Sequence, residues 1–182
     1  MPTSRNIFLV GPMGSGKSAV GSWLAGRLSL QFADSDRYIE EQTGVDIALI
    51  FEIEGEEGFR AREEKALEHL CAQRNIVLAT GGGAVLRESN REALRAGGSV
   101  VYLKCGLDEQ VRRTRDIRNR PLLASGPKRD ILKDLMLQRG PLYLEVASHV
   151  VDTTGRRVRQ VGQDILQLLK ENQERGIASK QA

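Results

Sequence analysis

Gly11-Pro12-Met13-Gly14-Ser15-Gly16-Lys17-Ser18 has the spacing G-x-x-x-x-G-K-[ST], which is typical of a phosphate-binding loop. Its glycines permit backbone angles that side chains forbid, so that successive amide N–H groups can converge on one anion. Lys17 adds a mobile cation that can follow charge on a transferred phosphoryl group, and the Ser18 hydroxyl is a hard oxygen suited to Mg²⁺. The motif predicts a bound nucleoside triphosphate with its metal.

The segments on either side of this loop support the prediction. The apolar run Asn6-Ile7-Phe8-Leu9-Val10 precedes it and is typical of a short buried strand. A helical pattern follows, whose apolar residues share one face: Val20, Trp23, Leu24 and Leu28. A glycine-rich turn that only joins a strand to a helix would explain neither Lys17 nor Ser18, so the phosphate site is favoured.

The composition of the chain is that of one compact globular domain. Among its 182 residues, 40% are hydrophobic and 28% are charged, which is ordinary for such a domain. The net charge is +3, but only 4% of the residues are aromatic, too few for a base-stacking surface. We therefore expect a cationic cleft for small anions rather than a nucleic-acid surface. No apolar run is long enough to span a membrane and no leader resembles a secretory signal, so we expect a cytoplasmic protein.

The cysteines and histidines give no sign of a metal or redox site. Cys71 and Cys105 are far apart in the sequence and neither belongs to a C-x-x-C pair, which predicts two free buried thiols. His69 and His149 are isolated, and their spacing fits no metal-site pattern.

The rest of the chain alternates between expected strands and expected helices. Strands are predicted at residues 31–33, 75–80, 99–103 and 149–152. Helices are predicted at 37–43, at 45–70 with Asp46 as its cap, at 89–97 with a capping box at its start, at 130–139 before Gly140-Pro141, and at 158–169. This alternation predicts an α/β fold with a parallel sheet and crossover helices.

Two groups of residues at the carboxyl ends of expected strands are candidate ligand contacts. Residues two apart in an extended segment share a face, so Asp34 and Asp36 should point together toward the metal and an acceptor hydroxyl. On local grounds, Asp36 could equally be the cap of the helix that follows. Gly81-Gly82-Gly83 would let a ligand approach bare backbone, and a flexible turn is the alternative.

Periodicity fails between residues 111 and 129, where arginines accumulate: Arg112, Arg113, Arg115, Arg118 and Arg120. A solvated charged loop is the usual explanation of such a run. In a phosphoryl-transfer protein it can also be a lid that supplies a cation and excludes water. We expect a single domain over 1–182, with a helical lobe at about 37–70, a lid at about 112–129 and a frayed tail at about 170–182.

These motifs, in this order, resemble the shikimate kinase family from Asn6 to about Leu169. The shared segments are G-P-M-G-S-G-K-S at 11–18, D-S-D at 34–36, F-E-I-E-G-E-E-G-F-R at 51–60, T-G-G-G at 80–83, R-P-L-L at 120–123 and R-G-P-L-Y at 139–143. The resemblance implies a three-layer α/β/α kinase domain of the nucleoside monophosphate kinase type, with a five-stranded parallel sheet in the order 2-3-1-4-5. It also implies a cytoplasmic, monomeric enzyme of aromatic amino-acid biosynthesis that uses Mg-ATP to phosphorylate the 3-hydroxyl of shikimate, with ADP as the other product.

The resemblance also implies a role for each candidate residue. In the acceptor site, Asp36 binds the reacting hydroxyl, while Arg60 and Arg139 hold the substrate carboxylate with forked hydrogen bonds. The remaining acceptor contacts are the backbone of Gly81, Gly82 and Gly83 and an apolar wall of Phe51 and Phe59. The ATP contacts are Gly14, Ser15, Gly16, Lys17, Ser18, Ala19, Arg120 and Arg156. Mg²⁺ binds Ser18 directly and Asp34 through water, and the catalytic set is Lys17, Asp36 and Arg120. Glu63 is expected to orient Arg60 from one helical turn away.

Two other functions remain open at this point. A related kinase could use the same residues on another carboxylated polyol, such as a sugar acid. A nucleotide-binding module could instead switch a partner without turning over an acceptor, and its slow ATP hydrolysis would not respond to any hydroxy acid. No nucleic-acid or membrane partner is expected.

Overall fold

The computed structural model of the chain describes residues 6–115, 121–123 and 126–178. Its five strands form one parallel sheet in the order β2-β3-β1-β4-β5. The strands are β1 (Ile7–Val10), β2 (Gln31–Asp34), β3 (Ile76–Ala79), β4 (Ser99–Lys104) and β5 (His149–Asp152). The fold class and the strand order predicted above are confirmed.

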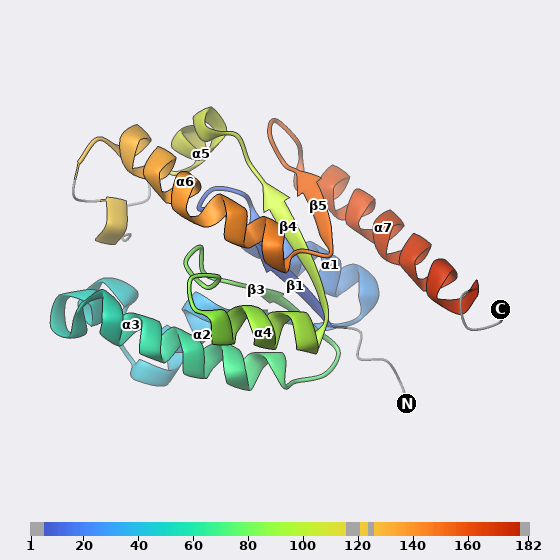
Figure 1. Ribbon diagram of the computed structural model, residues 1–182, viewed down its shortest axis with the longest axis horizontal. Helices are drawn as coiled ribbons and strands as arrows, with labels where there is room; N and C mark the ends of the chain where they lie inside the picture. Colours follow the sequence, from blue (N-terminus) through green and yellow to red (C-terminus); the bar gives the residue numbers. More distant parts are fainter. Residues whose placement is uncertain (1–5, 116–120, 124–125, 179–182) are drawn as a thin grey trace.

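Helices cover both faces of the sheet (Figure 1). They are α1 (Lys17–Leu28), α2 (Ser35–Thr43), α3 (Ile47–Cys71), α4 (Glu88–Gly97), α5 (Leu107–Arg113), α6 (Lys128–Val146) and α7 (Val158–Ala178), with a short 3₁₀ turn, η1, at Pro121–Leu123. Helices α1 and α7 lie on one face, while α4, α6 and the end of α3 lie on the other. The result is the three-layer arrangement expected of this strand–helix alternation.

The two faces of the sheet carry two separate apolar cores. All four residues of β1 are buried, as expected for a central parallel strand covered on both sides. Phe8 and Val10 pack with Leu94 of α4 and Tyr143 of α6, whereas Leu9 packs on the other face with α1 and α7. The central strand is therefore fixed from both sides, and the loop that follows it starts from a rigid base.

Helices α2 and α3 form the region expected to be a helical lobe. Asp46 caps α3 as predicted, since its side chain accepts a hydrogen bond from the Leu49 amide at 2.8 Å. A third apolar cluster joins the two helices through Ile39, Ile47, Ile50, Phe59 and Ala66. Gly55 has φ 70° and interrupts the helical geometry of α3. The division of the chain into a helical lobe and a lid stays a prediction.

The prediction that Gly140-Pro141 ends a helix is wrong. Helix α6 continues through Pro141 to Val146. Pro141 has no N–H to donate to the carbonyl of Leu137, four residues earlier. The Leu137 side chain is 70% exposed, so this turn of the helix faces solvent and water can replace the missing donor. Beyond the proline, Tyr143 and Val146 are buried in the core, and this burial outweighs the local cost of the proline.

The predicted capping box at Ser89 is also wrong. Helix α4 begins at Glu88 with Arg87 in the cap position, and no side chain caps it. The Ser89 hydroxyl instead donates a hydrogen bond to Glu64 of α3. Arg87 also pairs with Glu64, so a tertiary contact with α3 replaces the local one.

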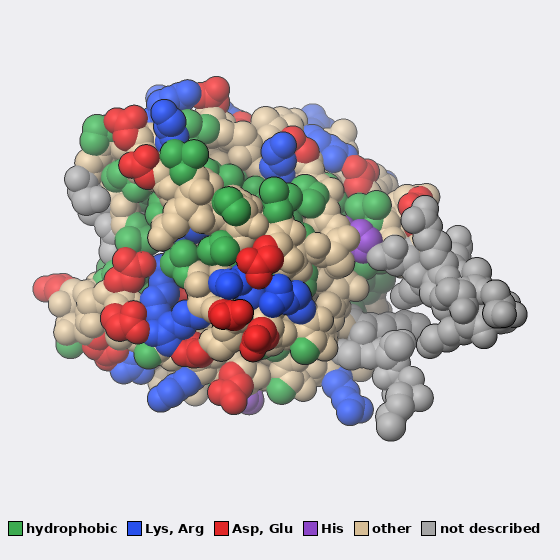
Figure 2. Space-filling view, in the orientation of Figure 1, with side chains coloured by type: hydrophobic (Ala, Val, Ile, Leu, Met, Phe, Trp, Pro, Cys, Tyr) green, Lys and Arg blue, Asp and Glu red, His purple; other side chains and the backbone are tan. Residues whose placement is uncertain are grey.

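Three further expectations concern the cysteines, the end of the chain and membrane-spanning segments. Cys71 and Cys105 are free and buried, as predicted. Helix α7 keeps helical geometry to Ala178, and fraying of the end of the chain stays a prediction. Among the described residues, no helix combines the length and the apolar character needed to cross a membrane. On the face shown in Figure 2, acidic and basic side chains are interspersed.

Candidate active site

The phosphate-binding loop connects the end of β1 to the start of α1. Gly11, Gly14 and Gly16 have φ values of 145°, 77° and 89°, which explains why glycine occupies these positions. The Lys17 amine lies within the loop and donates hydrogen bonds to the carbonyls of Gly11 and Pro12, each at 2.8 Å. Gly16, the residue before α1, has no side chain that could cap the helix, so the amides of the first turn suit an anion.

Ser18 and Asp34 lie side by side next to this loop. The Ser18 hydroxyl donates to Oδ2 of Asp34 at 2.6 Å. Two adjacent oxygen donors suit Mg²⁺, which takes one or two protein ligands and completes its shell with phosphate oxygens and water. Within the described ranges no group of three or more His, Cys, Asp or Glu side chains could hold a metal without such help. The residues present therefore fit Mg²⁺ bound together with a nucleotide.

The expected extended geometry of Asp34 and Asp36 is wrong. The other oxygen of Asp34, Oδ1, accepts hydrogen bonds from the amides of Asp36 and Arg37 at 3.0 and 3.3 Å. Asp34 is thus the cap of α2, and Asp36 lies in its first turn. The helix begins directly after the strand because this carboxylate satisfies two of its free amides.

One hollow brings together every acceptor-site residue that the sequence predicted. Its volume is ≈ 420 Å³, including space open to solvent. It is lined by Asp36, Phe51, Phe59, Arg60, Gly81, Gly82, Gly83 and Arg139, together with Met13, Ile47, Glu63 and Leu122. Met13 belongs to the phosphate-binding loop, and a Cβ built on Gly82 would lie 3.7 Å from the Met13 amide. The loop and the hollow therefore share a wall.

Arg60 is a buried cation held by two carboxylates. Its side chain donates to Glu63 at 2.7 Å and to Glu56 at 3.0 Å, and it lies 5.2 Å from the ring centre of Phe59. Burial lowers the pKa of Arg60, but the two carboxylates raise it by more. The contact with Glu63 confirms the expected pairing one turn apart, and it fixes the direction of the guanidinium in the hollow.

Arg139 and Glu63 are buried, and each has a buried polar atom without a hydrogen-bond partner among the described residues. Arg139 is 4% exposed and Glu63 is fully buried. Nε of Arg139 and Oε1 of Glu63 have no hydrogen-bond partner among the described protein atoms. Burial and the nearby Arg60 both lower the pKa of Arg139, and burial raises the pKa of Glu63 despite Arg60. Two guanidiniums facing one hollow that offers a single buried carboxylate make a site suited to an anionic ligand.

Two of the three glycines after β3, Gly81 and Gly83, are required by the side chains that crowd them. A Cβ on Gly81 would lie 2.6 Å from Oδ1 of Asp36 and 2.8 Å from Oε1 of Glu63. A Cβ on Gly83 would overlap the Arg60 guanidinium. The Gly81 amide donates to the buried Ser35 hydroxyl at 2.9 Å, which fixes this segment next to α2. The glycines thus form a wall of defined shape, and a merely flexible turn does not describe them.

We expect Gly83→Ala to raise the acceptor KM by about tenfold or more, because the new methyl group displaces the Arg60 guanidinium from the hollow. The affinity for ATP should not change. The measurement is steady-state kinetics with each substrate varied in turn.

Gly26→Ala is the matched control. A Cβ at Gly26, in α1, would meet no atom within 4 Å. It should leave both KM values unchanged and stabilise the helix by about 1 kcal/mol. An unchanged acceptor KM in Gly83→Ala would show that the position of Arg60 does not matter for the acceptor.

The structure describes only some of the residues that were predicted to contact ATP. Arg120 lies outside the described residues. The Arg156 guanidinium donates to the Asp152 carbonyl at 3.1 Å and pairs with Asp164 at 2.7 Å, so its contact with adenine stays a prediction. Ala19 is exposed at the start of α1.

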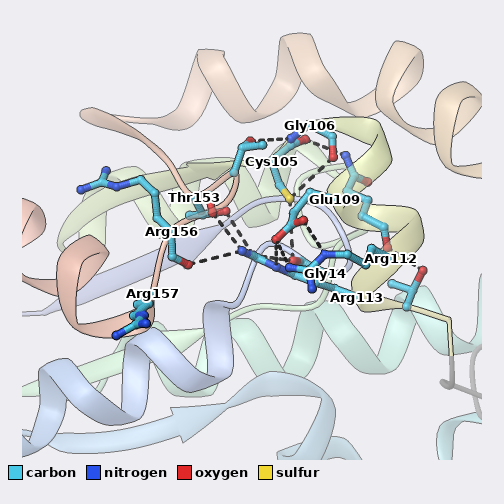
Figure 3. Close-up of polar contacts among 12 residues, drawn as sticks. Gly14, Cys105, Gly106, Glu109, Arg112, Arg113, Thr153, Arg156 and Arg157 are labelled. Carbon is cyan, nitrogen blue, oxygen red and sulfur yellow. Dashed lines mark hydrogen bonds and ion pairs between the residues drawn. The ribbon is translucent and has the colours of Figure 1, made fainter.

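No motif in the sequence singles out Arg113. It was grouped with the arginines of the expected lid, but the structure places it in α5, where it contacts the phosphate-binding loop (Figure 3). Only the short helical pattern at 107–113 could have separated it from that group.

Comparison with known proteins identifies the group to which this chain belongs. The family model described as shikimate kinase matches residues 13–170. The chain belongs to the shikimate kinase family. A shikimate kinase of Thioalkalivibrio sulfidiphilus is 52% identical over 177 residues, which cover 97% of this chain and 93% of that protein. One from Pseudomonas aeruginosa is 53% identical over 165 residues, which cover 91% and 96%.

Solved structures agree with this assignment. The shikimate kinase from Acinetobacter baumannii in complex with shikimate has a TM-score of 0.91 and 48% identity, and the match covers 93% of this chain and 95% of that one. The resemblance found in the motifs is thereby confirmed. The chain is a small-molecule kinase of this family, and the family implies ATP as a substrate.

Proposed function

We propose that this enzyme transfers the γ-phosphoryl group of ATP to the 3-hydroxyl of shikimate, giving shikimate 3-phosphate and ADP. The observation that carries the proposal is the pair Arg60 and Arg139, both buried and both lining the hollow that adjoins the phosphate-binding loop. The unpartnered Nε of Arg139 suits a carboxylate oxygen, and the bare glycine backbone suits the hydroxyls of a ring.

In the proposed complex the phosphate-binding loop holds the nucleotide. The backbone amides of Gly14, Ser15 and Gly16 and the first turn of α1, with Ser18 and Ala19, surround the phosphates. Lys17 leaves the carbonyls of Gly11 and Pro12 and follows the transferred group. Ser18 would hold Mg²⁺ directly and Asp34 through water, and the ion would neutralise part of the phosphate charge.

Asp36 is the proposed partner of the reacting hydroxyl. Its Oδ1 faces the Gly81 wall of the hollow, so a hydroxyl there can donate to it. The hydroxyl oxygen attacks the γ-phosphorus while the bond to the β-phosphate oxygen breaks, and the proton moves to Asp36. Orientation of the attacking oxygen is the larger part of this contribution, because the transition state of phosphoryl transfer is loose.

Other parts of the proposal concern residues and properties around this site. Phe51 and Phe59, whose ring centres are 4.8 Å apart, form the apolar wall for the ring of the acceptor. The proposed lid, expected at about 112–129, lies between α5 and α6, because Arg112 and Arg113 belong to α5 and Lys128 and Arg129 belong to α6. In this proposal Arg120 supplies a second cation at the γ-phosphate, and Arg156 contacts adenine. We further propose a cytoplasmic monomer without a nucleic-acid or membrane partner.

A coupled assay of ADP release, with ATP, Mg²⁺ and a panel of hydroxy acids, tests the proposal. Shikimate should stimulate ADP release well above the rate with ATP alone, while sugar acids should not. Stimulation by a sugar acid in its place would identify another acceptor for the same site. An ADP release that no hydroxy acid increases would contradict the proposed reaction.

A further inference from the structure

Helix α6 carries two buried polar side chains that lie next to the acceptor hollow. The helix packs on β4, on one face of the sheet (Figure 1). Arg139 and Tyr143 are four residues apart on it, so they lie on the same side of the helix. Arg139 lines the hollow, whereas Tyr143, which is 1% exposed, is not among the described residues that do. Tyr143 can therefore act on an acceptor only through the groups that it holds.

One hydrogen bond from Tyr143 fixes a peptide group of the glycine segment 81–83. Its hydroxyl donates to the carbonyl of Gly82, a residue that lines the hollow. The carbonyl of Gly82 and the amide of Gly83 belong to one planar trans peptide group and point in opposite directions. Among the described residues, no group accepts a hydrogen bond from the Gly83 amide. This amide is therefore a donor of fixed direction beside the hollow.

The same hydroxyl lies beside Arg139. A Cβ built on Gly82 would lie 3.6 Å from Nη1 of Arg139, so this guanidinium and the Gly82 backbone are neighbours. Burial raises the pKa of Tyr143, although the charge of Arg139 and a hydrogen bond from it act in the opposite direction. The phenol thus stays neutral, and a neutral hydroxyl can accept from Arg139 and donate to Gly82 at the same time. Tyr143 joins a cation of the acceptor site to a peptide group of its wall.

The ring of Tyr143 is anchored in the core. Its centre lies 5.1 Å from that of Tyr102 in β4, with 28° between the ring planes. Both rings belong to the apolar core on this face of the sheet, together with Val10 at the end of β1. The phosphate-binding loop begins directly after Val10. The hydroxyl therefore has a defined position relative to the central strands, and hence to the start of the loop.

We propose that Tyr143 is a positioning residue of the acceptor site, whose hydroxyl holds the Arg139 guanidinium and the Gly82–Gly83 peptide group at one fixed separation. This inference deepens the proposed function and rests on it, since that function assigns Arg139 to the carboxylate and the glycine backbone to the ring hydroxyls. In a rigid cyclic hydroxy acid, the carboxylate and the hydroxyls are also a fixed distance apart. Two protein groups that are already spaced to match bind such an acid with less loss of order.

Tyr143→Phe tests the proposal, because it removes the hydroxyl and keeps the ring. The Gly82 carbonyl then loses this donor, and Arg139 loses this acceptor. We expect the KM for shikimate, and its dissociation constant from titration calorimetry, to rise by about tenfold. The fall in kcat should be smaller than this rise, and the KM for ATP should not change.

Tyr102→Phe is the matched control, because it is the same substitution in the same core. Tyr102 is 3% exposed and stacks on Tyr143. Burial raises the pKa of Tyr102, and so do Cys105 and Asp152, which places its hydroxyl near the ends of β4 and β5. Its KM values and kcat should stay within about twofold of those of the wild type.

A double-mutant cycle with Arg139→Lys tests the link to the guanidinium. Lysine keeps the charge but not the forked geometry, so Arg139→Lys alone should raise the KM for shikimate. In the double variant the rise should be smaller than the product of the two single effects, because both changes act on the same group. Effects that multiply in full would show that Tyr143 does not act through Arg139, and would overturn the inference.

Melting temperatures, recorded for every variant, separate positioning from a purely structural role. An unchanged KM for shikimate in Tyr143→Phe would overturn the inference, and so would equal rises in the KM for shikimate and the KM for ATP. If this variant is unfolded at the assay temperature, the measurements are repeated in the cold. A Tyr143→Phe protein that is unfolded even there, while Tyr102→Phe is folded, would show that the hydroxyl serves the fold and would overturn the inference too.

Binding and turnover together distinguish this inference from the proposed function. If the wild-type enzyme binds shikimate without phosphorylating it, and Tyr143→Phe binds it about tenfold more weakly, the positioning role stands and the proposed function fails. If the wild-type enzyme binds no carboxylated acceptor, both fail.

Discussion

Lys17→Ala should lower kcat by about 10³-fold or more, while the KM for shikimate changes little. The Lys17 amine is already inside the phosphate-binding loop, 2.8 Å from the carbonyls of Gly11 and Pro12. In the proposed reaction it moves from these carbonyls to the transferred phosphoryl group, where negative charge develops. Lys17 does not line the acceptor hollow, so the acceptor should bind as before. Steady-state kinetics with each substrate varied in turn measures both effects.

Lys65→Ala is the control for loss of a lysine, because Lys65 is exposed on α3 and does not line the hollow. Its kinetic constants should match those of the wild type. Removal of the Lys17 amine also leaves two loop carbonyls without this donor, so a small drop in melting temperature is expected, equivalent to about 1 kcal/mol. A Lys17→Ala enzyme with kcat within tenfold of the wild type would remove this lysine from the transfer step.

The strands and the phosphate-binding loop could be predicted from the sequence because local and global requirements agree there. The run Ile76–Ala79 is apolar throughout and its residues are buried on both faces, so pattern and burial indicate the same element. The glycines at 11, 14 and 16 are needed for positive φ, which no other common residue adopts easily. For such segments the residue types alone determine the backbone.

The helix boundaries that were predicted wrongly depend on residues distant in the sequence. Pro141 stays inside α6 because Tyr143 and Val146 are buried against the sheet. Ser89 does not cap α4 because Glu64, 25 positions earlier, accepts its hydroxyl. A local pattern cannot include such partners, so tertiary contacts override it.

Eight residues that line the hollow could be predicted from the sequence, through motifs that they share with the family, but the contacts between them could not. The sequence could not show why only glycine fits at two of these positions. A larger residue at Gly81 would clash with Asp36 and Glu63, and one at Gly83 would clash with Arg60. Arg113 was missed for a similar reason, because its partners are backbone carbonyls 40 or more positions away.

Asp36→Asn should abolish most phosphoryl transfer, with a loss in kcat of about 10²- to 10⁴-fold. An amide can still contact the reacting hydroxyl, but it cannot accept its proton or orient it as strongly. Binding of ATP should be unchanged. Asp46→Asn is the matched control, because Asn is as good a helix cap as Asp and Asp46 does not line the hollow.

The melting temperature separates this loss from simple misfolding. The charge of Asp36 raises the pKa of the buried Glu63, as burial itself does, so the two carboxylates disfavour each other in the folded protein. Replacing Asp36 by a neutral amide removes this like charge but also removes a carboxylate from the first turn of α2, so the melting temperature should stay close to that of the wild type. A stable but inactive Asp36→Asn enzyme would show that this carboxylate is needed for the reaction and not for the fold. Full activity in the same variant would mean that another group handles the hydroxyl.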